Sequence, residues 1–242
     1  MKIMNELVRY QYRQYVLSAK YVVPLIGLFA VFQFMYSFPP AEIVSSFAIM
    51  GLVLFVIMVW VGMTCQEIEP EVSEQIIILR MKSERKYYIG PVLCSGVLSG
   101  VVTLLSIGFP VVVHYLQGKM LFARDILVSD IIGGILLMFA CSFVGSMVGG
   151  IFSSRIIRKR EGGIVLTIFC ALVSVTRIGI VENVPISKYI LWIVPPVADV
   201  VGWFTREEYY DMRKIIGAFF LLMGYGIVLA VVKVELCKIR KF

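Results

Sequence analysis

Residues 43–65 read IVSSFAIMGLVLFVIMVWVGMTC, and residues 66–88, QEIEPEVSEQIIILRMKSERKYY, follow them directly. The first stretch is long and apolar enough to cross the roughly 30 Å hydrocarbon core of a bilayer as a helix. The second stretch has glutamates in its first half and, in its second half, the basic residues Arg80, Lys82, Arg85 and Lys86. This charge order suits the dipole of a short helix. The sequence therefore predicts a membrane span that leads into a polar loop with a helix of its own.

The composition of the whole chain is that of a polytopic membrane protein. Of its 242 residues, 60% are hydrophobic and 16% are charged, and the mean hydropathy is +0.90. Soluble domains are only about 45–50% apolar. Stretches long enough to span a bilayer are residues 21–38, 43–65, 91–116, 126–152, 163–181 and 215–232. We expect an all-α integral membrane protein with six transmembrane helices, folded as one domain over residues 1–242.

The distribution of Lys and Arg predicts which ends of the spans face the cytosol. Most of the 23 basic residues lie in residues 1–20, 66–90, 153–162 and 233–242. Positive charge stays on the cytosolic side, so we expect a multi-pass protein of the cell membrane with both termini in the cytosol. The net charge of +7 suits anionic lipid headgroups beside the spans better than nucleic acid.

Residues 1–20 have the periodicity of an amphipathic helix. The basic side chains on one side are Arg9, Arg13 and Lys20, and the apolar side chains roughly opposite are Ile3, Leu7, Tyr10 and Leu17. Such a helix would lie flat in the cytosolic membrane interface. The alternative is a set of flanking charges that merely precedes the first span.

The segment 182–214, between the fifth and sixth spans, contains a second unusual pattern. Residues 186–204, ISKYILWIVPPVADVVGWF, are apolar, but Pro195 and Pro196 interrupt them and Asp199 follows. A proline pair breaks a helix and leaves too short a run on either side to span the bilayer. We expect two short helices that re-enter the outer leaflet. The alternative, one kinked full span, would place the C-terminus outside.

The residues that could do chemistry are few. His114 is the only histidine, the five cysteines form no CxxC pair, and no phosphate-binding GxxxxGK[ST] loop occurs, so we predict no metal site and no ATP site in this chain. Arg177, near the outer end of the fifth span, is interpreted as a structural ion pair with Glu182 or a snorkelling side chain, with substrate contact as the alternative. The small residues of the fourth span favour packing within the bundle over a dimer seam.

The helix in the polar loop is the strongest candidate for a functional element. If it begins at Pro70, a residue suited to the first turn, then Val72, Ile76 and Leu79 share one face. An apolar face flanked by charges on a cytosolic loop is typical of a docking element. The alternative is that this face rests on the membrane surface.

The loop also resembles a known family. Glu67, Glu69, Glu74, Ile78, Leu79, Ser83 and Arg85 stand in an order similar to the loop of permease subunits of type-2 ATP-binding-cassette (ABC) exporters, which read approximately E-x-E-x-G-T-x-E-x-L-L-x-x-P-x-S/T-R. The order of interfacial helix, two-span hairpin, charged loop and re-entrant pair before the last span is similar too. Val72 and Ser73 replace the Gly-Thr pair, no proline precedes Ser83, and Pro91 replaces a lysine.

This resemblance implies a coupling helix that docks a separate cytosolic ATPase. The docking residues would be Glu67, Glu69, Val72, Glu74, Ile76, Leu79, Arg80, Ser83 and Arg85. The implied complex has two permease chains, identical or different, and two ATPase chains that carry ATP and Mg, while this chain binds no cofactor. It would export a hydrophobic or amphipathic substrate such as a peptide. The alternative is a non-transporting scaffold or sensor that docks a cytosolic regulator; a lipid-modifying enzyme is disfavoured because paired catalytic residues are lacking.

Overall fold

The regular elements of this computed structural model are all helical. The structure describes residues 2–69, 71–81, 83–153, 157, 160–184, 186, 189 and 191–239. The elements are α1 (Lys2–Leu17), α2 (Val22–Met35), α3 (Ile43–Gln66), α4 (Glu71–Met81), α5 (Glu84–Leu116), α6 (Val128–Ile151), α7 (Arg160–Asn183), the 3-10 turn η1 (Leu191–Ile193), α9 (Val197–Gly202) and α10 (Met212–Ile239). The prediction of an all-helical fold is therefore confirmed for the described residues.

Five of the described helices are long and apolar enough to cross a membrane, namely α3, α5, α6, α7 and α10. A sixth span exists only if α1 and α2, which meet at a bend of 74°, count together. On its own α2 is about 21 Å long at 1.5 Å per residue, shorter than the predicted span over residues 21–38. It ends at Met35 because Pro39 and Pro40 follow, and proline disfavours helix both at its own position and just before it.

α5 begins earlier than hydropathy predicts. The expected span starts at Pro91, but the helix starts at Glu84 and contains both Pro91 and Pro110. Hydropathy detects the part of a helix that suits lipid, and residues 84–90 are too polar to be counted. The expected loop over residues 66–90 is therefore short in the structure: α4 is followed almost directly by α5.

α3 and α6 form the centre of the bundle through direct backbone contact. A side chain at Gly145 would collide with the carbonyl of Phe55, and one at Gly149 would collide with the carbonyl of Val59. Gly62 lies against the carbonyl of Ser146 in the same way. Small residues allow close approach of helices in lipid. These glycines of the fourth span thus serve packing within the bundle, as favoured from the sequence.

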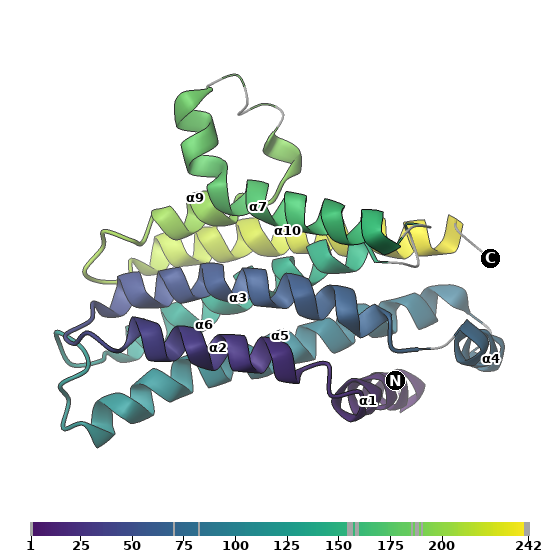
Figure 1. Cartoon of the computed structure of the whole chain (residues 1–242), viewed down its shortest axis with the longest axis horizontal. Helices are drawn as coiled ribbons and strands as arrows, with labels where there is room; N and C mark the ends of the chain where they lie inside the picture. The colour runs from purple at the N-terminus through teal and green to yellow at the C-terminus, as the bar shows by residue number, and fades with distance from the viewer. Residues whose placement is uncertain are drawn as a thin grey trace.

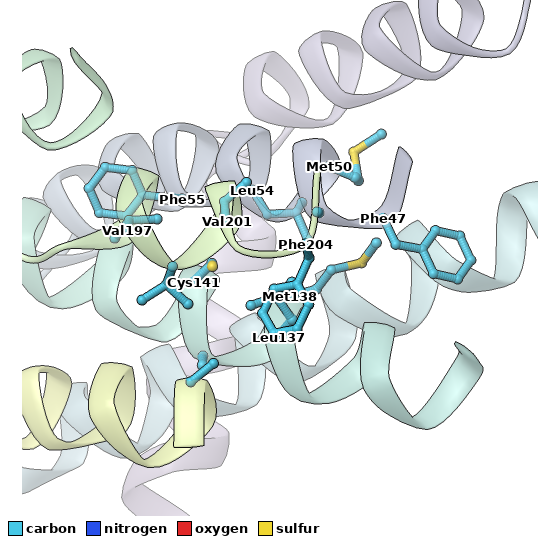
Figure 2. Close-up of a cluster of buried hydrophobic side chains, with 14 of the residues drawn as sticks. Phe47, Met50, Leu54, Phe55, Leu137, Met138, Cys141, Val197, Val201 and Phe204 are labelled. Atoms are coloured by element: carbon cyan, nitrogen blue, oxygen red, sulfur yellow. The ribbon is translucent and has the colours of Figure 1, made fainter. Parts of the chain in front are cut away.

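α9 covers the core formed by α3 and α6. Figure 2 shows Val197, Val201 and Phe204 directed toward Leu54 and Phe55 of α3 and toward the side chains of α6, which are Leu137, Met138 and Cys141. Val197 and Phe204 are fully buried. The six-residue α9 is far too short to cross a bilayer, so the described part of segment 182–214 contains no full span.

The start of α1, the end of α10 and α4 lie toward one end of the bundle, and the turns 36–42, 117–127 and 203–211 lie at the other end (Figure 1). At that far end, Arg124 binds Asp130 through both guanidinium nitrogens at 2.6 and 3.0 Å and donates to the carbonyl of Glu208 at 2.8 Å. Lys119 pairs with Asp125 at 2.8 Å and lowers the pKa of that carboxyl. The contacts of Arg124 tie the turns 117–127 and 203–211 to the start of α6.

Candidate functional site

α4 is attached to the end of the bundle by its inward face. Ile77, Ile78 and Met81 pack against an apolar cluster whose buried members are Leu7 of α1, Tyr87 and Tyr88 of α5, and Val234 of α10. Residues three and four apart lie on one face of a helix, so this packing directs the opposite face of α4 away from the bundle. In Figure 1, α4 lies across the bundle axis beside the N-terminus.

The outward face of α4 is apolar and exposed. Ile76 is 61% exposed and Leu79 is 76% exposed, and the polar side chains of Gln75 and Arg80 lie beside them. Ile76 and Leu79 thus share one free face, as the sequence predicts. Val72, the third residue expected there, lies in the first turn of α4, but its side chain is not among those described, and Pro70 lies outside the described residues.

A groove of about 590 Å³ separates α4 from α1. Its α1 wall is formed by Glu6, Leu7 and Tyr10, and its α4 wall includes Ile76 and Arg80. The groove has apolar walls with one acidic and one basic side chain at its rim. Such a surface can accept an apolar side chain from a partner protein, and the charged groups at the rim can fix the orientation of that partner.

The remaining predicted docking residues are not all on this surface. Glu69 accepts a hydrogen bond from the Tyr87 hydroxyl at 2.6 Å, and Glu74 is buried. Glu67 is half-buried directly after α3, and Ser83 occupies the position before α5. Arg85 pairs with Glu235 of α10 at 3.5 Å. Of the predicted docking residues whose side chains are described, Ile76, Leu79 and Arg80 are the ones that face outward on α4.

A buried polar cluster beneath α4 was missed from the sequence. Gln66 donates from Nε2 to the carbonyl of Gly150 at 3.1 Å and accepts from the Ser153 hydroxyl at 3.0 Å. Lys233 is buried, and its amino group lies so close to Gly150 that a side chain there would approach Nζ to 2.7 Å. A lone lysine within the apolar run of the last helix was the one available signal. Through this cluster α3, α6 and α10 meet.

α1 packs against α5 along one face. A Cβ at Gly90 of α5 would come within 2.5 Å of the end of the Leu7 side chain, so a larger residue there would make Leu7 shift. Tyr15 is buried, while Leu17, expected on the apolar side of this helix, is 69% exposed. The packed face therefore runs through Leu7, Gln11 and Tyr15. Arg9 and Arg13 are exposed and Lys20 is half-buried.

No family model, curated protein or solved structure matches this chain.

The segment around η1 and α9 is held on α7 by a charge pair. Arg177, with a side chain only 6% exposed, lies 3.2 Å from Asp199, and its guanidinium donates to the carbonyl of Val194 at 3.4 Å. The prediction that Arg177 pairs with Glu182 was wrong. Arg177 pairs with Asp199 instead, because α9 is folded back against α7. Pro195 and Pro196 are buried. Arg177 thus ties the segment around η1 and α9 to α7.

His114 is buried. Its Nδ1 accepts the backbone N–H of Phe122 at 3.3 Å, and its ring contacts that of Phe122. The histidine thereby closes the turn 117–127. Within the described residues, no group of three His, Cys, Asp or Glu side chains could hold a metal ion.

An apolar cavity of about 740 Å³ lies between α6, α10 and the turn around η1. Trp192, Ile193 and Pro195 line one end of it, and Val232 and Phe152 line the other. The Tyr225 hydroxyl donates to the carbonyl of Trp192 at 3.0 Å and so joins α10 to the outer turn. The cavity is within the size range of small-molecule sites and suits apolar groups.

Proposed function

We propose that this chain is the membrane-spanning permease subunit of an ABC exporter, with α4 as the helix that docks a separate cytosolic ATPase. The observation that carries the proposal is the exposed apolar pair Ile76 and Leu79 on a helix whose other face is fixed to the bundle. A face this apolar in water is favourable only when a partner covers it. The resemblance of the loop to the permease family supports the choice of partner.

The proposal places α4 and both termini in the cytosol, α1 in the membrane interface and η1–α9 in the outer leaflet. Placement of the start of α1, the end of α10 and α4 toward one end of the bundle supports this topology. The polar cluster of Gln66, Ser153 and Lys233 would pass movements of α4 to three spans. The apolar cavity supports a hydrophobic or amphipathic substrate, such as a peptide, for export by two permease chains.

The test is co-purification with the ATP-binding subunit encoded beside the gene. We expect the wild-type chain to retain this ATPase and Leu79→Asp to lose it, because a buried unpaired charge in the interface typically costs several kcal/mol. Met120→Asp is the matched control: Met120 is 74% exposed but lies at the opposite end of the bundle. Retention of the ATPase by Leu79→Asp would refute docking through α4.

The same experiment separates the alternative of a scaffold or sensor. If α4 binds a cytosolic protein without ATPase activity, then Leu79→Asp would still release that protein, but the complex would not hydrolyse ATP. Hydrolysis by the wild-type complex, stimulated by an amphipathic peptide, is the result expected for an exporter.

A further inference from the structure

The bend between α1 and α2 encloses a crevice of about 320 Å³. Tyr12 and Val16 of α1 and Leu25 of α2 form one side of the crevice, and Val101 and Leu105 of α5 form the other. Apart from tyrosine hydroxyl groups, the lining is apolar. Val16, Val101 and Leu105 are also partly exposed at the outside of the bundle, so the crevice is open to the surrounding membrane.

Basic side chains lie next to this crevice. Arg9 lies one turn before Tyr12, and Arg13 lies one turn before Val16. This spacing places all four side chains on neighbouring parts of the α1 surface. Arg9 and Arg13 are exposed, and Lys20 lies in the bend itself. Residues 7–41 contain no Asp or Glu. Among the described ion pairs, none involves these three cations.

We propose that the bend binds one anionic phospholipid of the cytosolic leaflet, with an acyl chain in the crevice and the phosphate beside Arg9 and Arg13. An apolar crevice open to the membrane admits a hydrocarbon chain, and three cations set against Glu6, the single acidic residue of α1, favour a negative headgroup. Tyr12, Tyr15 and Tyr21, which line the crevice, supply the amphipathic rings that occupy the level between headgroup and chain.

A lipid in this position would link α1 and α2 to α5. The direct contacts of α1 with α5 lie along Leu7 and Tyr15, and the crevice is the gap that these contacts leave between the bend and α5. The proposal rests on the placement of α1 in the membrane interface stated above. The lipid proposal does not depend on an ATPase partner. The lipid site and the docking of an ATPase by α4 can therefore be refuted separately.

The experiment uses the purified full-length chain in detergent and counts bound lipids by native mass spectrometry. Phosphatidylglycerol and phosphatidylcholine with the same acyl chains are compared, and glycerol phosphate serves as the headgroup without chains. We expect one phosphatidylglycerol to bind in preference to phosphatidylcholine, and no binding of glycerol phosphate. Equal binding of the two lipids, or binding of glycerol phosphate alone, would overturn the proposal.

Two variants locate the site. The double variant Arg9→Gln/Arg13→Gln should bind phosphatidylglycerol about 30-fold more weakly, since each basic residue near a membrane surface contributes about fivefold. Val101→Trp should fill the crevice and reduce the binding of both lipids. The matched control is Arg206→Gln/Arg213→Gln, which removes the same charge at the other end of the bundle. This control should still prefer phosphatidylglycerol to phosphatidylcholine. If the Arg9→Gln/Arg13→Gln variant also keeps this preference, the site is not at this bend.

Discussion

At the residue scale, single glycines decide how closely the two central helices approach. A Cβ added at Gly149 of α6 would collide with the carbonyl of Val59. A Cβ added at Gly108 of α5 would have no atom within 4 Å. We predict that Gly149→Ala lowers the free energy of unfolding by about 1–3 kcal/mol, because overpacked helices must separate. Gly108→Ala should be neutral or stabilising by up to about 1 kcal/mol through its better helix propensity.

Thermal unfolding of both variants in the same detergent measures this difference. A Gly149→Ala protein that unfolds at the same temperature as Gly108→Ala would show that α3 and α6 are not in backbone contact. The sequence indicated that the small residues of the fourth span favour packing. The sequence could not show which helix these glycines contact, because each glycine lies more than eighty residues from the carbonyl that it meets on the other helix.

Arg177 and Asp199 provide a second test at the residue scale. We predict that Arg177→Gln destabilises the segment around η1 and α9 by about 1–3 kcal/mol, less than the 3–5 kcal/mol for breaking a fully buried pair, because the Asp199 side chain is 33% exposed. Hydrogen exchange over residues 191–204 should become faster, while exchange in α3 and α6 stays unchanged. The double variant Arg177→Asp/Asp199→Arg should recover part of the protection; an equally fast exchange in all three proteins would argue against the pair.

At the element scale, the apolar runs predicted the helices of the bundle well, and their ends less well. α3, for example, was predicted over residues 43–65 and ends at Gln66, where polar residues begin. α5 starts seven residues before its apolar run, because a helix can continue beyond the lipid wherever its backbone hydrogen bonds are satisfied. The outward pair Ile76 and Leu79 was predictable from helical spacing. Burial of Glu74 was not, since it depends on packing of α4 against the bundle.

At the scale of the whole molecule, the arrangement predicts that α4 and the turn 117–127 lie on opposite sides of the membrane. Leu79 and Met120 have almost equal exposure, at 76% and 74%. In intact cells, a membrane-impermeant maleimide should label Met120→Cys and leave Leu79→Cys unlabelled until the cells are permeabilised. The wild-type protein, with its five native cysteines, gives the background. Labelling of Leu79→Cys in intact cells would reverse the orientation derived from the positive charges.

The contact of α3 with α6 also determines how movement can travel through the bundle. Phe55, Val59 and Ser146 present backbone carbonyls to glycines of the opposite helix, so neither helix can slide along the other without first separating from it. The two helices are therefore packed as one unit, with α4 following one end of α3 and α9 packed on its middle part. We expect a tilt imposed at the α4 end to move Leu54, beneath α9, which lies about 18 Å from Gln66 along α3.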